Sequence, residues 1–125
     1  MPAAGPLASV LPPVTAPGWA TFMTGTLPAT HGVFDFFDPC SPDLDKPRLV
    51  TRSDVRASEF WDYLSQSGAR SAILNVPRAH PQSLFEGLQL PGLMGPGEGQ
   101  DATPSGALEA LAPELGPYRL YTSSP

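Results

Sequence analysis

The sequence predicts an α/β fold in which helices flank a mostly parallel sheet. Residues 53–67 place apolar side chains at helical spacing, and Gly68 follows them as a helix-ending residue. Residues 71–76 are then nearly continuous in apolar side chains, as in a parallel strand covered on both faces. Residues 7–11 predict a short strand that leads into another helix, the arrangement that places ligands at the carboxyl edge of a sheet.

Length and composition limit the classes of function. The chain has 125 residues, enough for one modest core, and a net charge of −5. Proteins that bind the phosphate backbone of nucleic acids normally carry a basic surface, so we expect no nucleic-acid polymer as a partner. The single cysteine, Cys40, excludes an internal disulfide. No signal peptide or membrane-spanning segment is evident, so we expect no membrane association and a cytoplasmic location.

Residues 12–37 form the stretch on which the functional prediction depends. Thr15 is a predicted helix cap, because its hydroxyl can accept a hydrogen bond from an amide two or three residues further on. Pro17 suits the first helical turn, where its missing N–H costs nothing. Gly25 is predicted to end the helix in a left-handed cap.

One face of this helix is predicted to be buried. Trp19, Phe22 and Met23 place large apolar groups at i, i+3 and i+4, which is the spacing of a helical face. The N-terminus of a packed helix offers free amides and the positive end of the helix dipole. It therefore favours a bound anion such as phosphate.

Two interpretations of Thr15 follow from this arrangement. In the first, Thr15 is an ordinary helix cap, the usual solution for unpaired helix amides. In the second, it is a nucleophile beside an anion site. A threonine hydroxyl is weak at neutral pH and needs a neighbouring base or a metal ion to activate it, and residues 12–37 supply neither on their own.

The segment after this helix predicts a strand and a long loop. Residues 33–37 are aromatic and β-prone. Asp35 and Asp38 flank the predicted strand; paired carboxylates can bind metal ions, but two acids in a solvated turn are the commoner case. Residues 38–52 predict a loop, since prolines interrupt them.

The segment after residues 71–76 is the second candidate for ligand binding, because ligands lie at the carboxyl ends of strands in open α/β sheets. Arg78 could contact a substrate phosphate through its guanidinium group, and His80 could face the same cleft. The alternative is a cation in a solvated loop.

The C-terminal part of the chain is predicted to be rich in loops. Residues 88–90 predict an edge strand, and residues 92–99 a flexible loop. A helix is predicted over residues 103–111, with Thr103 as its cap and Pro113 as its stop.

Several ordered motifs can be compared with known families. The first group is Pro12-Pro13-Val14-Thr15-Ala16-Pro17-Gly18-Trp19, Thr24-Gly25-Thr26-Leu27-Pro28-Ala29-Thr30-His31-Gly32 and Val33-Phe34-Asp35-Phe36-Phe37. A second, weaker group is Ile73-Leu74-Asn75-Val76-Pro77, Pro81 and Gly92-Leu93-Met94-Gly95-Pro96. Together they resemble the alkaline phosphatase superfamily, and most of all its branch of type I phosphodiesterases, nucleotide pyrophosphatases and predicted phosphohydrolases or phosphomutases.

The resemblance implies an alkaline-phosphatase-like sandwich and the metal-dependent hydrolysis of a small phosphoester or nucleotide-like substrate. Thr15 stands at the position of the family's nucleophile, which is also a ligand of one of two divalent metal ions, usually zinc. Backbone amides near Ala16, Gly18 and Trp19 would bind phosphate oxygens, and Arg78 would assist.

Two positions of the first motif qualify this comparison. Gly18 stands where many nucleotide pyrophosphatases carry an asparagine that holds a phosphate oxygen, so this chain lacks one side-chain donor. His31 matches a histidine of the family motif, and we interpret it as packing the turn and not as a metal ligand.

The resemblance also implies that the chain is incomplete. Family members are several times longer, and most of their metal ligands come from other regions; residues 1–11 hold no Asp, Glu or His. We expect residues 1–125 to be one partial domain, with a nucleophile-bearing core portion at 7–76 and a loop-rich, cap-like portion at 77–125. The isolated chain is then expected to be inactive. The alternative is a non-catalytic α/β remnant with a structural or interaction role.

Overall fold

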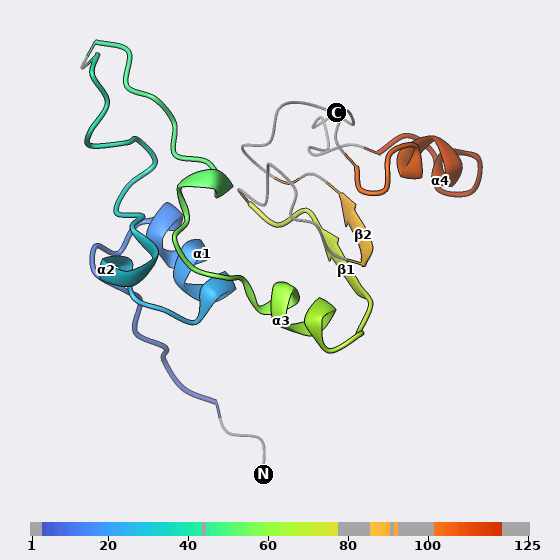
Figure 1. Ribbon diagram of the computed structural model, residues 1–125, viewed down its shortest axis with the longest axis horizontal. Coiled ribbons are helices and arrows are strands. Elements are labelled where there is room, and N and C mark those ends of the chain that lie inside the picture. Colours follow the sequence, from blue (N-terminus) through green and yellow to red (C-terminus); the bar gives the residue numbers. More distant parts are fainter. Residues whose placement is uncertain (1–3, 44, 78–85, 91, 93–101, 119–125) are drawn as a thin grey trace.

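The computed structural model describes residues 4–43, 45–77, 86–90, 92 and 102–118. Its elements in chain order are α1 (Thr15–Thr24), α2 (Pro28–His31), the 3-10 helix η1 (Arg52–Asp54), α3 (Phe60–Gln66), β1 (Ser71–Leu74), β2 (Gly87–Leu90) and α4 (Ala107–Leu115). In Figure 1, α1 and α2 lie at one side, α3 and the two strands follow, and α4 lies at the opposite side. The predicted α/β class is confirmed. The predicted division after residue 76 stays a prediction.

The sheet consists of β1 and β2, which pair in parallel. Ser71 lies opposite Gly87, and Leu74 opposite Leu90. A Cβ atom at Gly87 would overlap the carbonyl oxygen of Ser71, so this pairing requires glycine. The prediction that residues 71–76 are covered on both faces is wrong for the described part of the chain. Ile73 is buried in a cluster with Trp61 of α3, but Leu74, which points to the opposite face of β1, is 55% exposed.

The remaining side of β2 pairs with Thr103. Gln89 and Thr103 exchange two backbone hydrogen bonds, of 2.8 and 2.9 Å, in an isolated antiparallel bridge. Thr103 therefore does not cap a helix as predicted. Instead α4 begins at Ala107 after Gly106, and Pro113 lies inside it without stopping it. The helix ends two residues later, where the amide of Gly116 donates to the carbonyl of Ala112 at 2.9 Å.

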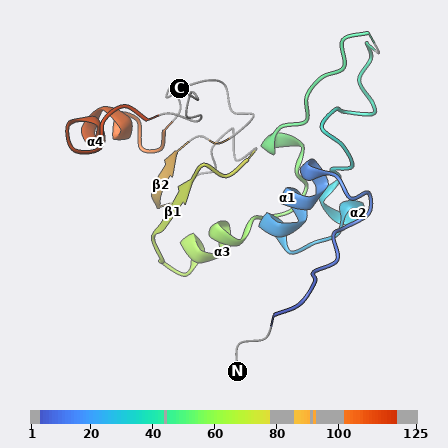
Figure 2. The same cartoon turned by 180° about the vertical axis from the view of Figure 1, so that it is seen from behind.

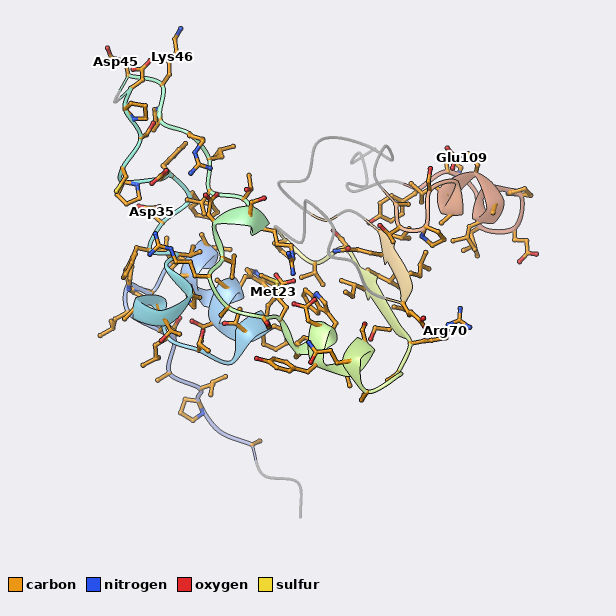
Figure 3. All side chains as sticks on the ribbon, viewed as in Figure 1. Met23, Asp35, Asp45, Lys46, Arg70 and Glu109 are labelled. Carbon is orange, nitrogen blue, oxygen red and sulfur yellow. The ribbon has the colours of Figure 1, made fainter. Side chains whose placement is uncertain are left out.

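The core consists of two clusters that α1 joins. The first comprises Ala16, Ala20, Val33 and Val50, with Phe36 and Val55 packed against it. The second comprises Met23, Trp61 and Ile73, with Trp19 and Val76 packed against it. Figure 3 shows Met23 between α1 and α3, where it connects the helix to the second cluster. The buried stripe of α1 is thus Ala16, Ala20 and Met23, and the predicted face is corrected: Phe22 is 67% exposed.

Two predicted strands are not formed. Residues 7–11 form a mostly exposed coil that leads into α1. This coil lies away from both strands of the described chain (Figures 1 and 2). Residues 33–37 form only a single antiparallel bridge, between Phe37 and Leu49. A β-prone segment becomes a strand only when a partner satisfies its backbone groups, and a single bridge does not supply a ladder.

The helix predicted over residues 53–67 is divided in two. The short turn η1 is fixed by Asp54, whose carboxylate accepts the amide of Thr51 at 2.7 Å. The chain is then extended, because the amide of Arg56 donates to the carbonyl of His31 at 3.0 Å and draws this segment toward α2. Of the predicted α-helix only α3 is formed, and Trp61 within it is 1% exposed and belongs to the core.

Candidate functional site

Thr15 is the first residue of α1 and not its cap. The N-cap residue is Val14, in an extended conformation with φ −113° and ψ 155°, and it has no side-chain oxygen to offer. The interpretation of Thr15 as a helix cap is therefore wrong. Its side chain is exposed, and the cap leaves its hydroxyl unused, so the hydroxyl is open to a ligand.

The amides around Thr15 are less available than the sequence implies. Val14 donates its N–H to Pro12 at 2.9 Å, and Gly18 donates its N–H to the carbonyl of Val14 at 3.1 Å. Pro17 has no N–H, and Ala16 is 0% exposed because its side of the helix faces the core. The amide of Thr15 lies in the first turn of α1, at the positive end of the helix dipole, where amides have no partner within the helix.

A hollow of about 440 Å³ lies beside Thr15. Its described lining consists of Ser9, Pro13, Val14, Thr15, Gly18, Trp19 and Phe22. Three of the predicted site residues, Thr15, Gly18 and Trp19, thus meet in one place, while Ala16 lies on the buried side. Arg78 and His80 lie outside the described residues.

Phe22 lines this hollow, although the i, i+3, i+4 pattern predicts it in the core. Trp19, which the same pattern places in the core, both packs against the second cluster and lines the hollow. The signal that could have separated them is the small-residue stripe of Ala16 and Ala20, which lets α1 pack closely on the first cluster.

His31 has a structural role, as predicted. The residue is fully buried, and its Nδ1 accepts the amide of Val33 at 3.1 Å. Nε2 must then carry the proton, which it donates to the Thr21 hydroxyl at 3.0 Å. The imidazole therefore ties α2 to α1.

The described residues do not by themselves form a metal site. Within residues 4–43, 45–77, 86–90, 92 and 102–118 there is no group of three or more His, Cys, Asp or Glu side chains that could hold a metal ion. Asp35 accepts the amide of Phe36, and Asp38 accepts the amide of Cys40 at 2.9 Å and pairs with Arg48. The Cys40 amide and then Arg48 lower the pKa of Asp38, so this carboxylate holds the loop. Thr15, the metal ligand that the resemblance implies for this chain, lies among the described residues.

A buried acid, Glu59, lies at the start of α3. The side chain of Glu59 is 1% exposed, and Nε of Arg52 donates to its Oε2 at 2.8 Å. Arg52 also contacts Asp62 at 3.3 Å, so the three side chains join η1 to α3. Burial raises the pKa of Glu59, although Arg52 opposes this effect. None of these three side chains lines the hollow beside Thr15.

One family model matches most of the chain. The family model described as type I phosphodiesterase / nucleotide pyrophosphatase matches residues 3–109. The chain belongs to this family. As a type I phosphodiesterase family member, it is also a member of the alkaline phosphatase superfamily, and the match includes both Thr15 and the two strands. Membership suggests a hydrolase that acts on phosphoester bonds, in a family that is typically metal-dependent and has an alkaline-phosphatase-like fold.

Two further searches add no relative. No curated protein matches the chain, and no solved structure matches it. None of the helices in the described ranges is both long enough and apolar enough to cross a membrane.

Proposed function

We propose that this chain carries the threonine nucleophile of a metal-dependent phosphodiesterase or phosphohydrolase. The observation that supports the proposal is the placement of Thr15. Its hydroxyl is exposed, is not used as a helix cap, and borders a hollow at the N-terminus of α1. An anionic phosphoryl group is favoured at that end of the helix.

In the proposed reaction, the Thr15 oxygen forms a bond to phosphorus while the bond from phosphorus to the leaving alcohol oxygen breaks. The Thr15 proton is lost, and the leaving alkoxide gains a proton. Water then attacks the phosphothreonine, which releases phosphate or a phosphomonoester and restores the hydroxyl. The amide of Thr15 and the dipole of α1 stabilise negative charge at the phosphoryl oxygens.

Two divalent metal ions, zinc by resemblance, would activate the hydroxyl and neutralise developing charge when bound. We assign Thr15 as one ligand, and the proposal places the others outside the described residues. The cytoplasmic location and the small phosphoester substrate remain parts of this proposal.

The test compares the 125-residue chain with the product of the longest reading frame that contains it. We expect two divalent ions per molecule and hydrolysis of a simple phosphodiester in the longer product, and no hydrolysis by the isolated chain. Thr15→Ala should lower the rate by at least about a thousandfold, since removal of a covalent nucleophile leaves only residual catalysis. Thr30→Ala, at an exposed threonine of α2 that does not line the hollow, is the control and should keep full activity.

The same experiment tests the second candidate, a non-catalytic structural or interaction role. The observation that favours it is the number of large apolar side chains left exposed in the described chain, including Leu27, Phe37 and Leu49 at 66, 47 and 46%. No hydrolysis by the longer product would favour this candidate. Hydrolysis that Thr15→Ala leaves unchanged would instead contradict Thr15 as the nucleophile.

A further inference from the structure

We propose that the hollow beside Thr15 selects phosphodiesters that carry a flat apolar group, such as an aryl ring, and that Trp19 and Phe22 determine this selectivity. The inference rests on the proposed function, because the phosphoryl group of the ester is placed at Thr15. It adds two residues that determine specificity, Trp19 and Phe22, which together form the aromatic wall of the hollow.

The hollow has the volume for such a group, and its rings lie on the same face of α1 as Thr15. Thr15, Trp19 and Phe22 follow one another at i, i+4 and i+7, so they share one face of α1. Gly18 lies on the same face, and a Cβ atom there would meet nothing within 4 Å, so the space between Thr15 and the rings is open. The volume of about 440 Å³ falls in the range of small-molecule sites.

The aromatic wall is held in place from within. Trp19 and Phe22 meet edge to face, with ring centroids 5.6 Å apart and an interplanar angle of 83°. Phe22 meets Phe60 in the same manner at 6.4 Å, and Phe60 meets the buried Trp61 at 4.7 Å. Four rings thus connect the hollow to the second core cluster. Phe22 is exposed, yet its orientation is fixed on two sides, which lowers the entropy that a ligand must overcome.

The lining also limits the charge of the ligand. All seven described lining residues are uncharged, and the chain as a whole carries −5. Among the described lining residues no side chain compensates the second charge of a monoester, whereas a diester carries one charge and a second substituent that the rings can contact. Apolar rings next to one polar nucleophile therefore favour a diester whose second substituent is flat and apolar.

The test measures binding without hydrolysis. The chain has two tryptophans, and Trp61 is 1% exposed, so the half-buried Trp19 is the one that acrylamide can quench. Phenyl methyl phosphate and dimethyl phosphate carry the same charge and differ by the ring. We expect phenyl methyl phosphate to protect Trp19 from acrylamide at a concentration about three- to tenfold lower, the factor expected for an added aromatic contact.

The variants separate the wall from the nucleophile. Phe22→Leu should reduce that ratio to about twofold or less, because the ring contact is lost and Phe22 is too exposed for its loss to unfold the chain. Phe34→Leu is the matched control, at a phenylalanine that is 46% exposed and outside the hollow, and should keep the ratio. Thr15→Ala should keep the ratio while removing hydrolysis in the longer product, so failure of the wall and failure of the nucleophile are distinguishable. Equal protection by both esters, protection by neither, or the same loss in Phe34→Leu would overturn the inference.

Discussion

Glu59 is a fully buried acid, and its charge should affect the stability of the chain. Burial raises its pKa in the folded state, with Arg52 opposing. The folded state therefore binds the proton more tightly than the unfolded state, whose glutamate pKa is about 4.3. Stability from this group is complete below that pH and is lost as the pH rises through the raised folded pKa. We expect the melting temperature of Glu59→Gln to fall less than that of the wild type as the pH rises from there to neutrality.

Two comparisons make this measurement specific to Glu59: a control variant, and other acids whose pKa values are shifted in the opposite direction. The pKa values of Asp38 and Asp54 are lowered, by the Cys40 amide and by Arg48 respectively, so their stabilisation is lost only as the pH falls below about 4. Glu109→Gln removes an exposed acid of α4, a helix that lies apart from α3 in Figures 1 and 3. It leaves the Arg52–Glu59 pair intact and should not reproduce the effect of Glu59→Gln. Parallel melting curves for Glu59→Gln and the wild type would contradict the assignment.

At the residue level, the course of α1 is easier to predict from sequence than the lining of the hollow beside it. Thr15 was identifiable because Pro17 and Gly25 fix where α1 runs, and both act through local backbone geometry. Phe22 was not, because helical spacing states which residues share a face but not which face meets the core. Ala16 and Ala20 take the core side since small side chains allow close packing on Val33 and Val50.

Two glycines, one inside α1 and one at its end, should respond in opposite ways to replacement by alanine. Gly25 has φ +66° and ends the helix by donating its N–H to the carbonyl of Thr21 at 2.8 Å. Gly25→Ala should lower the free energy of unfolding by about 1–2 kcal/mol, because a Cβ atom is disfavoured in the left-handed region. Gly18 lies inside the helix with open space around it, so Gly18→Ala should raise the free energy of unfolding by about 0.5–1 kcal/mol. Urea denaturation of both variants checks the pair, and a shift of the same sign in both would contradict this account of α1.

At the scale of elements, helices were predicted more successfully than strands. The sequence contains the N-terminal proline and the C-terminal glycine of α1 and the apolar run of β1, which are local signals. Residues 7–11 and 33–37 have β-prone composition but no ladder partner in the described chain, and pairing is not a local property. The helix predicted over residues 53–67 is interrupted for a different reason. The amide of Arg56 donates to the carbonyl of His31, and this tertiary contact holds Arg56 out of helical geometry.

Considered as a whole, the molecule depends on few buried side chains. The two clusters contain seven buried residues between them, and Trp61 is the largest. Trp61→Ala should cost about 3–5 kcal/mol through lost burial and a cavity. Since domains of this kind have about 5–15 kcal/mol in total, the variant should be largely unfolded at a urea concentration that leaves the wild type intact.

Phe60→Ala is the control for Trp61→Ala, because it removes a neighbouring ring of α3 that is 46% exposed. Its cost should be less than half as large, since much of that ring already contacts water in the folded state. Trp19 packs against the same cluster as Trp61, so unfolding of Trp61→Ala should also expose Trp19 fully to acrylamide, whereas Phe60→Ala should leave Trp19 on a folded α1. Equal losses of stability in the two variants would show that the second cluster does not hold the wall of the hollow.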